Sequence, residues 1–121
     1  MAFGLGVVTV KGQSMEPTLH TGDRMVVLRG APPRLGGLAI VRLPPDDVGA
    51  ARPLAVKRVT GRDPADPSRY WVECDNQAAP GRADSWTHGI GSLARDQIRA
   101  VVLFRLPSRL PLHRLRRRLS R

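Results

Sequence analysis

The sequence predicts a mostly β domain, either a small antiparallel sheet or a partly open barrel, followed by a short helical or coil tail. The chain has 121 residues, the length of one ordinary domain. Its 11 Pro and 12 Gly interrupt it about every five residues, which favours short strands over long helices. The apolar segments are also short and rich in Val, Leu and Ile. We expect the domain to span residues 1–106 and the tail to span residues 107–121.

Short β-branched segments bounded by turn residues predict the individual strands. The expected strands span residues 7–10, 24–30, 38–43, 53–61, 69–74 and 97–106. The fourth and fifth should form a hairpin around residues 62–68, which contain two prolines and two aspartates. Residues 75–92 form a long loop, and long loops in compact domains are usually functional or disordered.

The net charge of +10 favours a polyanionic partner, either nucleic acid or an anionic membrane surface. Residues 105–121 contain seven arginines and no acidic residue, so leaving them out lowers the net charge from +10 to +3. The basicity therefore belongs mainly to the tail, which is either a solvated end or an element that binds an anionic membrane surface. The aromatic and recognition-helix features of nucleic-acid readers are missing, so nucleic acid is disfavoured.

Cys74 is the only cysteine, which excludes an intramolecular disulfide and a cysteine-based metal site. We expect no metal and no other cofactor. No apolar stretch approaches the roughly 20 residues that span a bilayer. Residues 1–10 also lack the charged start and cleavage site of a secretory signal, so we expect a soluble or peripheral protein.

Ser14 lies in the segment GQSMEPTLHTGD, between the first expected strand and a turn that contains a proline. It is either a turn hydroxyl or a nucleophile, and a nucleophile needs a base to take its proton. His20, His88 and His113 are the histidine candidates. A Ser-His-Asp arrangement stays open, although no Gly-x-Ser-x-Gly elbow supports it.

Lysine is the other candidate base, and the chain has only Lys11 and Lys57 among its 20 basic residues. An arginine guanidinium does not deprotonate in proteins, whereas burial favours the neutral amine of a lysine. Strand alternation in LAVKRVT puts Lys57 on the same face as Ala55 and Val59. Arg58 should then point to the opposite face, toward solvent. Lys57 therefore has the apolar surroundings that a Ser/Lys pair requires.

Four motifs together resemble the type I signal peptidase family of Ser/Lys serine proteases. They are GQSMEPTLHTGD (12–23), VKRVTG (56–61), CDNQ (74–77) and ADSW (83–86), and their order and approximate spacing match the family. The resemblance implies a hydrolase with a β-rich catalytic domain. It also implies that Ser14 is the nucleophile and Lys57 the general base.

The resemblance implies supporting roles as well. Gly12, Met15 and Pro17 would shape the turn and the oxyanion site. Because Gly12 offers no side-chain hydroxyl, the backbone N–H of Ser14 would have to stabilise the oxyanion. Asp75 and Asn76 would begin the last conserved segment and support it, and Asp84 and Ser85 would support the region around the lysine.

Three positions depart from the family pattern. Cys74 replaces a glycine, and Arg82 replaces a serine that orients the lysine in many members. Trp86 replaces an arginine, which removes the usual ion pair with Asp84. The loop between Asp75 and Asp84 is also about two residues longer than in typical members. These departures leave Ser14 and Lys57 in place.

The implied reaction is removal of N-terminal signal or pro-peptides from precursor proteins. The resemblance implies a substrate bound as an extended strand, with small residues such as Ala before the cut, and residues 7–10 would pair with it. A signal peptidase would work at the extracytoplasmic face of a membrane. The short proteases that mature nickel superoxide dismutase precursors resemble this chain in length and in its FGL start, and they would imply a cytoplasmic enzyme.

Two other classes of protein are alternatives. A self-cleaving repressor shares the Ser/Lys chemistry but carries a cleavage site and a DNA-binding region before the serine, and only 13 residues precede Ser14. A non-catalytic basic module would bind a membrane or nucleic acid through its tail. Separate substitutions of Ser14 and Lys57 distinguish a protease from such a module.

Leucines recur among the tail arginines at four- and five-residue steps: Leu106, Leu110, Leu115 and Leu119. They predict a basic amphipathic helix at an anionic surface, where each Arg contributes about 1 kcal/mol.

Removing residues 107–121 should leave cleavage of a soluble peptide nearly unchanged and strongly weaken cosedimentation with anionic vesicles. Salt should weaken binding of the intact chain. If the full-length protein does not bind such vesicles at low salt, the tail is a solvated end.

Overall fold

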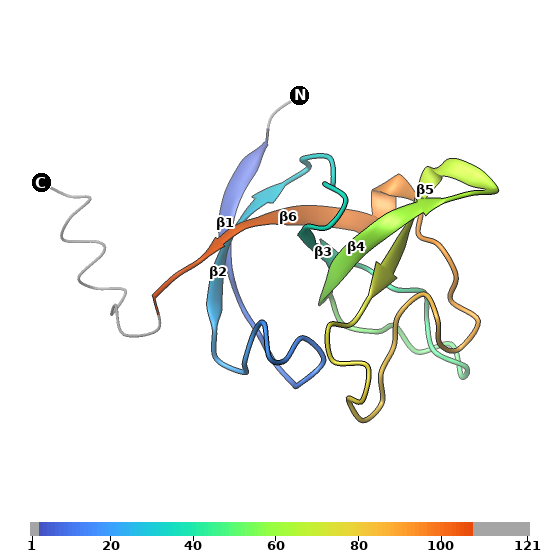
Figure 1. Cartoon of the computed structure of the whole chain (residues 1–121), viewed down its shortest axis with the longest axis horizontal. Helices are drawn as coiled ribbons and strands as arrows, with labels where there is room; N and C mark the ends of the chain where they lie inside the picture. The colour runs from blue at the N-terminus through green and yellow to red at the C-terminus, as the bar shows by residue number, and fades with distance from the viewer. Residues whose placement is uncertain (1–2, 108–121) are drawn as a thin grey trace, which may run out of the picture.

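Six strands form one antiparallel sheet in the order β1-β2-β6-β3-β4-β5 (Figure 1). The computed structural model describes residues 3–107, so residues 108–121 of the expected tail lie outside the described part. The elements are β1 (Gly4–Thr9), β2 (Arg24–Arg29), β3 (Leu38–Val41), β4 (Ala55–Asp63), β5 (Asp66–Glu73), the 3-10 helix η1 (Arg95–Gln97) and β6 (Ile98–Arg105). The predicted β class is confirmed, and the sheet is open, with β1 and β5 at its edges.

The β4–β5 hairpin is longer than the sequence predicts. Residues 62–68 were expected to form the turn, but the strands extend to Asp63 and resume at Asp66. Only Pro64 and Ala65 connect them. The Asp63 carboxylate accepts a hydrogen bond from Ala65 N at 2.9 Å, which satisfies a turn donor that would otherwise be unpaired. The prediction was wrong here because turn-forming residues also occupy the strand ends.

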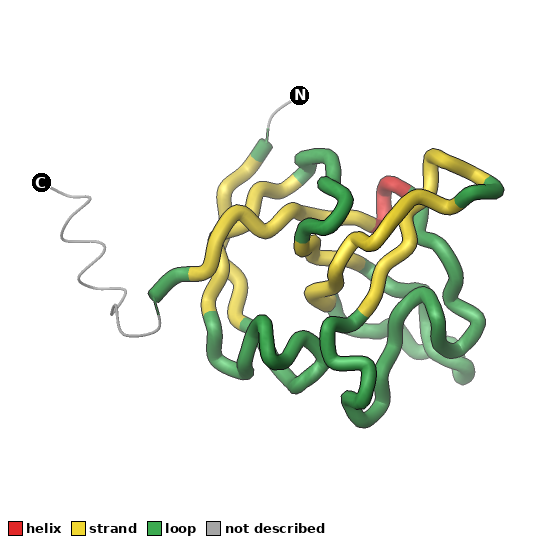
Figure 2. Tube along the Cα trace, in the orientation of Figure 1, coloured by secondary structure: helices red, strands yellow, loops and turns green. Residues whose placement is uncertain are grey.

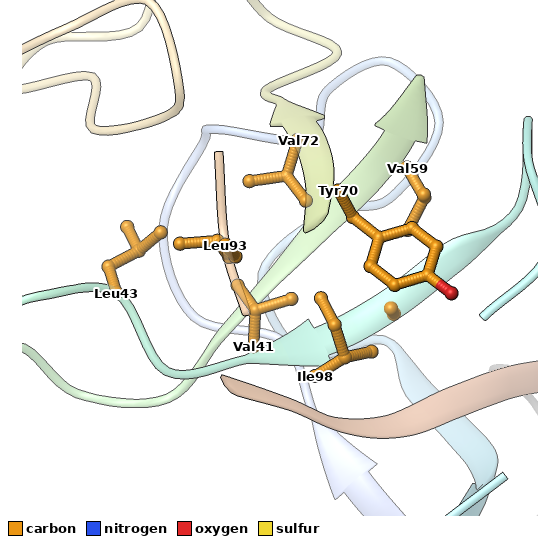
Figure 3. Packing of buried hydrophobic residues seen from close by; sticks show 8 residues of the cluster. Val41, Leu43, Val59, Tyr70, Val72, Leu93 and Ile98 are labelled. Carbon is orange, nitrogen blue, oxygen red and sulfur yellow. The ribbon is translucent and has the colours of Figure 1, made fainter. Parts of the chain in front are cut away.

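Two apolar clusters lie on the sheet, and β3 contributes to both. Figure 3 shows the first cluster, in which Val41 and its neighbours from β4, β5 and β6 pack together. Ile40 belongs to the second cluster because successive strand residues point to opposite faces. The first cluster comprises Ala39, Val41, Leu43, Val59, Tyr70, Val72, Leu93 and Ile98. The second comprises Val10, Met15, Leu19, Met25, Val27, Ile40 and Ala100.

The second cluster fixes the connection between β1 and β2, residues 10–23, which we call the Ser14 loop. Met15 and Leu19 bury their side chains in this cluster. The ends of the loop are joined by hydrogen bonds from Val10 N to Asp23 O at 2.8 Å and from Gly22 N to Val10 O at 2.9 Å. The loop therefore has a defined conformation, although it contains no regular helix or strand.

The expected loop at residues 75–92 is confirmed, and its first residues lie beside the Ser14 loop at one end of the sheet (Figure 2). Asn76 N donates a hydrogen bond to Ser14 O at 2.9 Å. Within residues 3–107, no helix has the length and apolar character that a membrane span requires.

Substitution of Leu93 tests how much the packing of the first cluster stabilises the fold, because the Leu93 side chain is 0% exposed. Leu93→Ala should lower the free energy of unfolding by about 2 to 5 kcal/mol, since it removes buried methyl groups and leaves a cavity. Leu35 is 57% exposed, and Leu35→Ala should cost less than about 0.5 kcal/mol. Urea denaturation followed by circular dichroism measures both. Equal losses in the two variants would contradict this assignment of the core.

Candidate active site

Ser14 is half-buried at the centre of a backbone segment that is held from two sides. Just before it, Gly12 adopts a φ of +87°, a left-handed conformation that favours glycine. Just after it, Met15 is 1% exposed in the second apolar cluster. Pro17 is exposed and follows a cis peptide bond. The local backbone therefore fixes the position from which the Ser14 hydroxyl projects.

An apolar groove of about 380 Å³ lies beside Ser14. It runs between the end of β1 and the start of β4, and its lining residues are Val8, Thr9, Val10, Lys11, Ser14, Met15, Ile40, Pro53, Leu54, Ala55 and Val56. Because β1 is an edge strand, one side of it is not paired within the sheet. The groove therefore lies beside Ser14 and beside an unpaired strand edge, to which an added strand can hydrogen-bond.

Lys57 lies on β4 directly after two residues that line the groove, Ala55 and Val56. Its predicted apolar surroundings are confirmed. Lys57 is 4% exposed, Val59 on the same strand face is 0% exposed, and Ala55 is half-buried. Within residues 3–107, Lys57 Nζ donates a hydrogen bond to Cys74 Sγ at 3.4 Å, and the Ser14 hydroxyl takes part in no hydrogen bond.

Asp75 and Asn76 connect the Ser14 loop to the end of β5. Asp75 N contacts Met15 Sδ at 3.4 Å, and Asn76 Nδ2 donates to Gln13 O at 3.0 Å. Together with the bond from Asn76 N to Ser14 O, these contacts bracket the serine. Asn76 therefore contacts the backbone on both sides of the serine, and Asp75 contacts Met15 next to it.

The sequence did not predict the ion pair of Arg58. Arg58 is partly exposed, as expected for the strand face opposite Lys57, and its Nε and Nη2 donate to the Asp75 carboxylate at 3.1 and 2.6 Å. Thr18 Oγ1 of the Ser14 loop donates to the same carboxylate at 2.6 Å. The Arg58 hydrogen bond lowers the pKa of Asp75, and Asp75 in turn raises the pKa of Arg58. One carboxylate therefore joins β4, the Ser14 loop and the end of β5.

Asp84 and Ser85 hold the 75–92 loop against β5. The Asp84 side chain is fully buried, and its Oδ2 accepts hydrogen bonds from Cys74 N at 3.0 Å and Gln77 Nε2 at 3.3 Å. Ser85 exchanges two hydrogen bonds with Val72, one through its Oγ and one through its backbone N, both at 2.9 Å. These two hydrogen bonds join Ser85 to β5 much as a neighbouring strand would, although Ser85 is not part of a strand.

The ion pair of Asp84 comes from a residue that the sequence did not suggest. Trp86 cannot form the usual ion pair with this carboxylate, but Arg82 Nε lies 3.7 Å from Asp84 Oδ2. This distance gives a charge contact without a hydrogen bond. Trp86 instead packs edge-to-face on Trp71 at a centroid distance of 5.1 Å and remains 63% exposed. The short sequence separation of Arg82 and Asp84 was the signal that could have predicted the pair.

Cys74 was expected to be a small buried residue, and it is 2% exposed. Its contact with Lys57 was missed. Desolvation raises the pKa of the thiol, and the neighbouring Lys57 opposes this effect only in part. The β4–β5 register pairs Arg58 with Glu73, so Lys57 and Cys74 are the next cross-strand neighbours. This register depends on bulges in the hairpin, so no local sequence signal indicated the contact.

Comparison with known families agrees with this geometry. The family model described as signal peptidase, peptidase S26, matches residues 1–77. The chain belongs to the signal peptidase family. At the family level it is a hydrolase, a serine peptidase of the signal peptidase type. The match includes Ser14, Lys57 and residues 74–77, and it ends before Asp84 and Ser85. No curated protein and no solved structure matched the chain.

The Arg58–Asp75 pair of this signal peptidase family member gives a pH-dependent prediction. The pKa of Asp75 lies below its ordinary value of 3.8, so the pair stabilises the fold above that pH and is lost as the pH falls through the lowered pKa. Asp75→Asn should therefore lower the free energy of unfolding at pH 7 by on the order of 1 kcal/mol. Its difference from the wild type should shrink below about pH 4.

Urea denaturation between neutral and acidic pH measures this effect. Asp96→Asn is the matched control, because Asp96 is exposed on η1. A difference between Asp75→Asn and the wild type that stays constant down to low pH would show that the Asp75 charge does not stabilise the fold.

Proposed function

We propose that this chain is a serine endopeptidase that removes N-terminal signal or pro-peptides, with Ser14 as nucleophile and Lys57 as general base. The observation that most supports this proposal is the burial of Lys57, at 4% exposure, on a strand whose preceding residues share a groove with Ser14. A lysine amine in its unprotonated form can accept a proton, which a guanidinium cannot. Membership of the signal peptidase family supports the same chemistry.

In the proposed reaction, Ser14 Oγ attacks the scissile carbonyl carbon while the neutral Lys57 amine takes its proton. The backbone N–H of Ser14 stabilises the resulting oxyanion, since Gly12 provides no side-chain donor. The Lys57 ammonium then protonates the leaving amine as the peptide C–N bond breaks, which leaves an acyl ester on Ser14. A water molecule, deprotonated by Lys57, hydrolyses this ester and restores the serine.

The substrate is proposed to bind as an extended strand along β1. The apolar groove between β1 and the start of β4, of about 380 Å³, would receive its apolar side chains, and family membership favours small residues such as Ala before the cut. Main-chain hydrogen bonds to the edge strand would supply affinity that does not depend on sequence.

We infer two possible settings for this reaction. In the first, the enzyme works at the extracytoplasmic face of a membrane, and the arginine-rich segment 107–121 contacts anionic lipids. In the second, the enzyme is a cytoplasmic maturation protease that acts on a pro-peptide. Family membership favours the first setting, because signal peptidases act on precursors that cross membranes.

Substitutions at the two proposed catalytic residues test the mechanism. Ser14→Ala should lower kcat for an Ala-containing peptide by at least about a thousandfold, because the nucleophile is lost. Lys57→Arg and Lys57→Met should be equally inactive, because neither side chain can accept the proton. Circular dichroism should show that the variants fold, and peptide cleavage followed by mass spectrometry measures the activity.

Two control variants make this test specific. His20→Ala and His88→Ala should cleave at near wild-type rates, because both rings are exposed. An active Lys57→Arg enzyme would refute the lysine base, and complete loss of activity in either histidine variant would favour a histidine base instead.

A further inference from the structure

The contact between Lys57 and Cys74 places a neutral sulfur against the proposed base. Lys57 Nζ lies 3.4 Å from Cys74 Sγ, and the two residues are 4% and 2% exposed. Because a buried amine has no water to hold it in one orientation, its protein partners determine where its lone pair points. The sulfur is therefore in a position to orient the nitrogen.

The thiol itself has a defined direction. Cys74 Sγ lies 3.8 Å from Ala83 O, within the range of a weak S–H donor to a carbonyl. A thiol hydrogen directed to Ala83 O leaves the sulfur lone pairs facing the Lys57 amine. The amine then donates one N–H to the sulfur, and its own lone pair stays available for another proton.

The backbone of Cys74 is fixed on both sides. Its N–H donates to Asp84 Oδ2 at 3.0 Å, and its C=O accepts from Gln77 Nε2 at 2.5 Å. Asp84 is fully buried and contacts Arg82 at 3.7 Å, which partly compensates its charge. The sulfur is thus held by residues that do not take part in the proposed chemistry.

We propose that Cys74 is the positioning residue for Lys57, whose nitrogen it orients so that the amine lone pair can accept the Ser14 proton. This inference rests on the proposed function. Burial keeps the thiol neutral by raising its pKa, so it orients the amine without forming an ion pair. A carboxylate at the same position would instead hold the proton on the lysine.

The charged groups around the pair come from three elements. Asp84 and Arg82 lie on the 75–92 loop, and Asp84 is close enough to act on the thiol. On β4, Arg58 is engaged by Asp75 at the end of β5. Both carboxylates therefore have an arginine partner, and the sulfur is the hydrogen-bond acceptor that the structure gives to Lys57.

Conservative and truncating substitutions at Cys74 test the proposal. Cys74→Ser keeps an acceptor of similar size and should retain kcat within about threefold, whereas Cys74→Ala should lower kcat by about 10- to 100-fold with little change in KM. Val72→Ala is the matched control: it truncates a buried side chain on β5, two residues before Cys74, and kcat should be unchanged in the folded enzyme. Wild-type kcat in Cys74→Ala would overturn the positioning role, and so would equal losses in the alanine and serine variants.

A pH profile gives a readout that a purely structural residue would not change. In Cys74→Asp, the new carboxylate favours the ammonium form, so the rising limb of kcat/KM should move to higher pH by about one unit or more. A profile that keeps the wild-type position would overturn the proposal. If thermal unfolding shows that this variant does not fold, the alanine and serine pair decides the question.

The same assay separates failure of this inference from failure of the proposed function. If Ser14→Ala and Lys57→Arg are inactive while Cys74→Ala is fully active, the Ser/Lys mechanism stands and the positioning role is wrong. If Lys57→Arg retains activity, the mechanism itself is wrong, and the inference fails with it.

Discussion

Three consecutive residues at the end of β5 hold the two parts of the candidate site together. Cys74 contacts the Lys57 amine, and Asn76 donates its backbone N–H to the carbonyl of Ser14. Asp75 between them accepts hydrogen bonds from the Ser14 loop and from β4. Ser14 and Lys57 are 43 positions apart in the sequence, so their arrangement depends on this short segment.

The charges near Lys57 follow one electrostatic constraint. An unpaired carboxylate close to a buried lysine would favour its ammonium form and hold the proton needed for general-base chemistry. Asp75 is paired with Arg58, and Asp84 accepts backbone and amide hydrogen bonds and lies close to Arg82. The neutral thiol of Cys74 is the group in direct contact with the amine.

Much of the fold could be predicted from the sequence because its strands are β-branched segments separated by Pro and Gly. The burial of Lys57 followed from strand alternation alone. The contact of Lys57 with Cys74 could not be predicted in this way. Counting from the Asp63–Asp66 pair would place Val72 opposite Lys57, but bulges in the hairpin shift the register to Cys74. Pairing across a bulge depends on the packing of both strands, which sequence patterns do not encode locally.

The many arginines and the buried lysine of this chain make different kinds of contact. Arginines donate to loop carbonyls throughout the described chain: Arg42 donates to Arg52 O, Arg69 to Ser92 O and Arg95 to Gly30 O. A guanidinium suits this role because it has five donors and keeps its charge at every physiological pH. Lys57 differs from all of them, since it is buried and carries an amine in place of a guanidinium. Arginine at the surface therefore stabilises the loops without introducing a second group that could compete as a base.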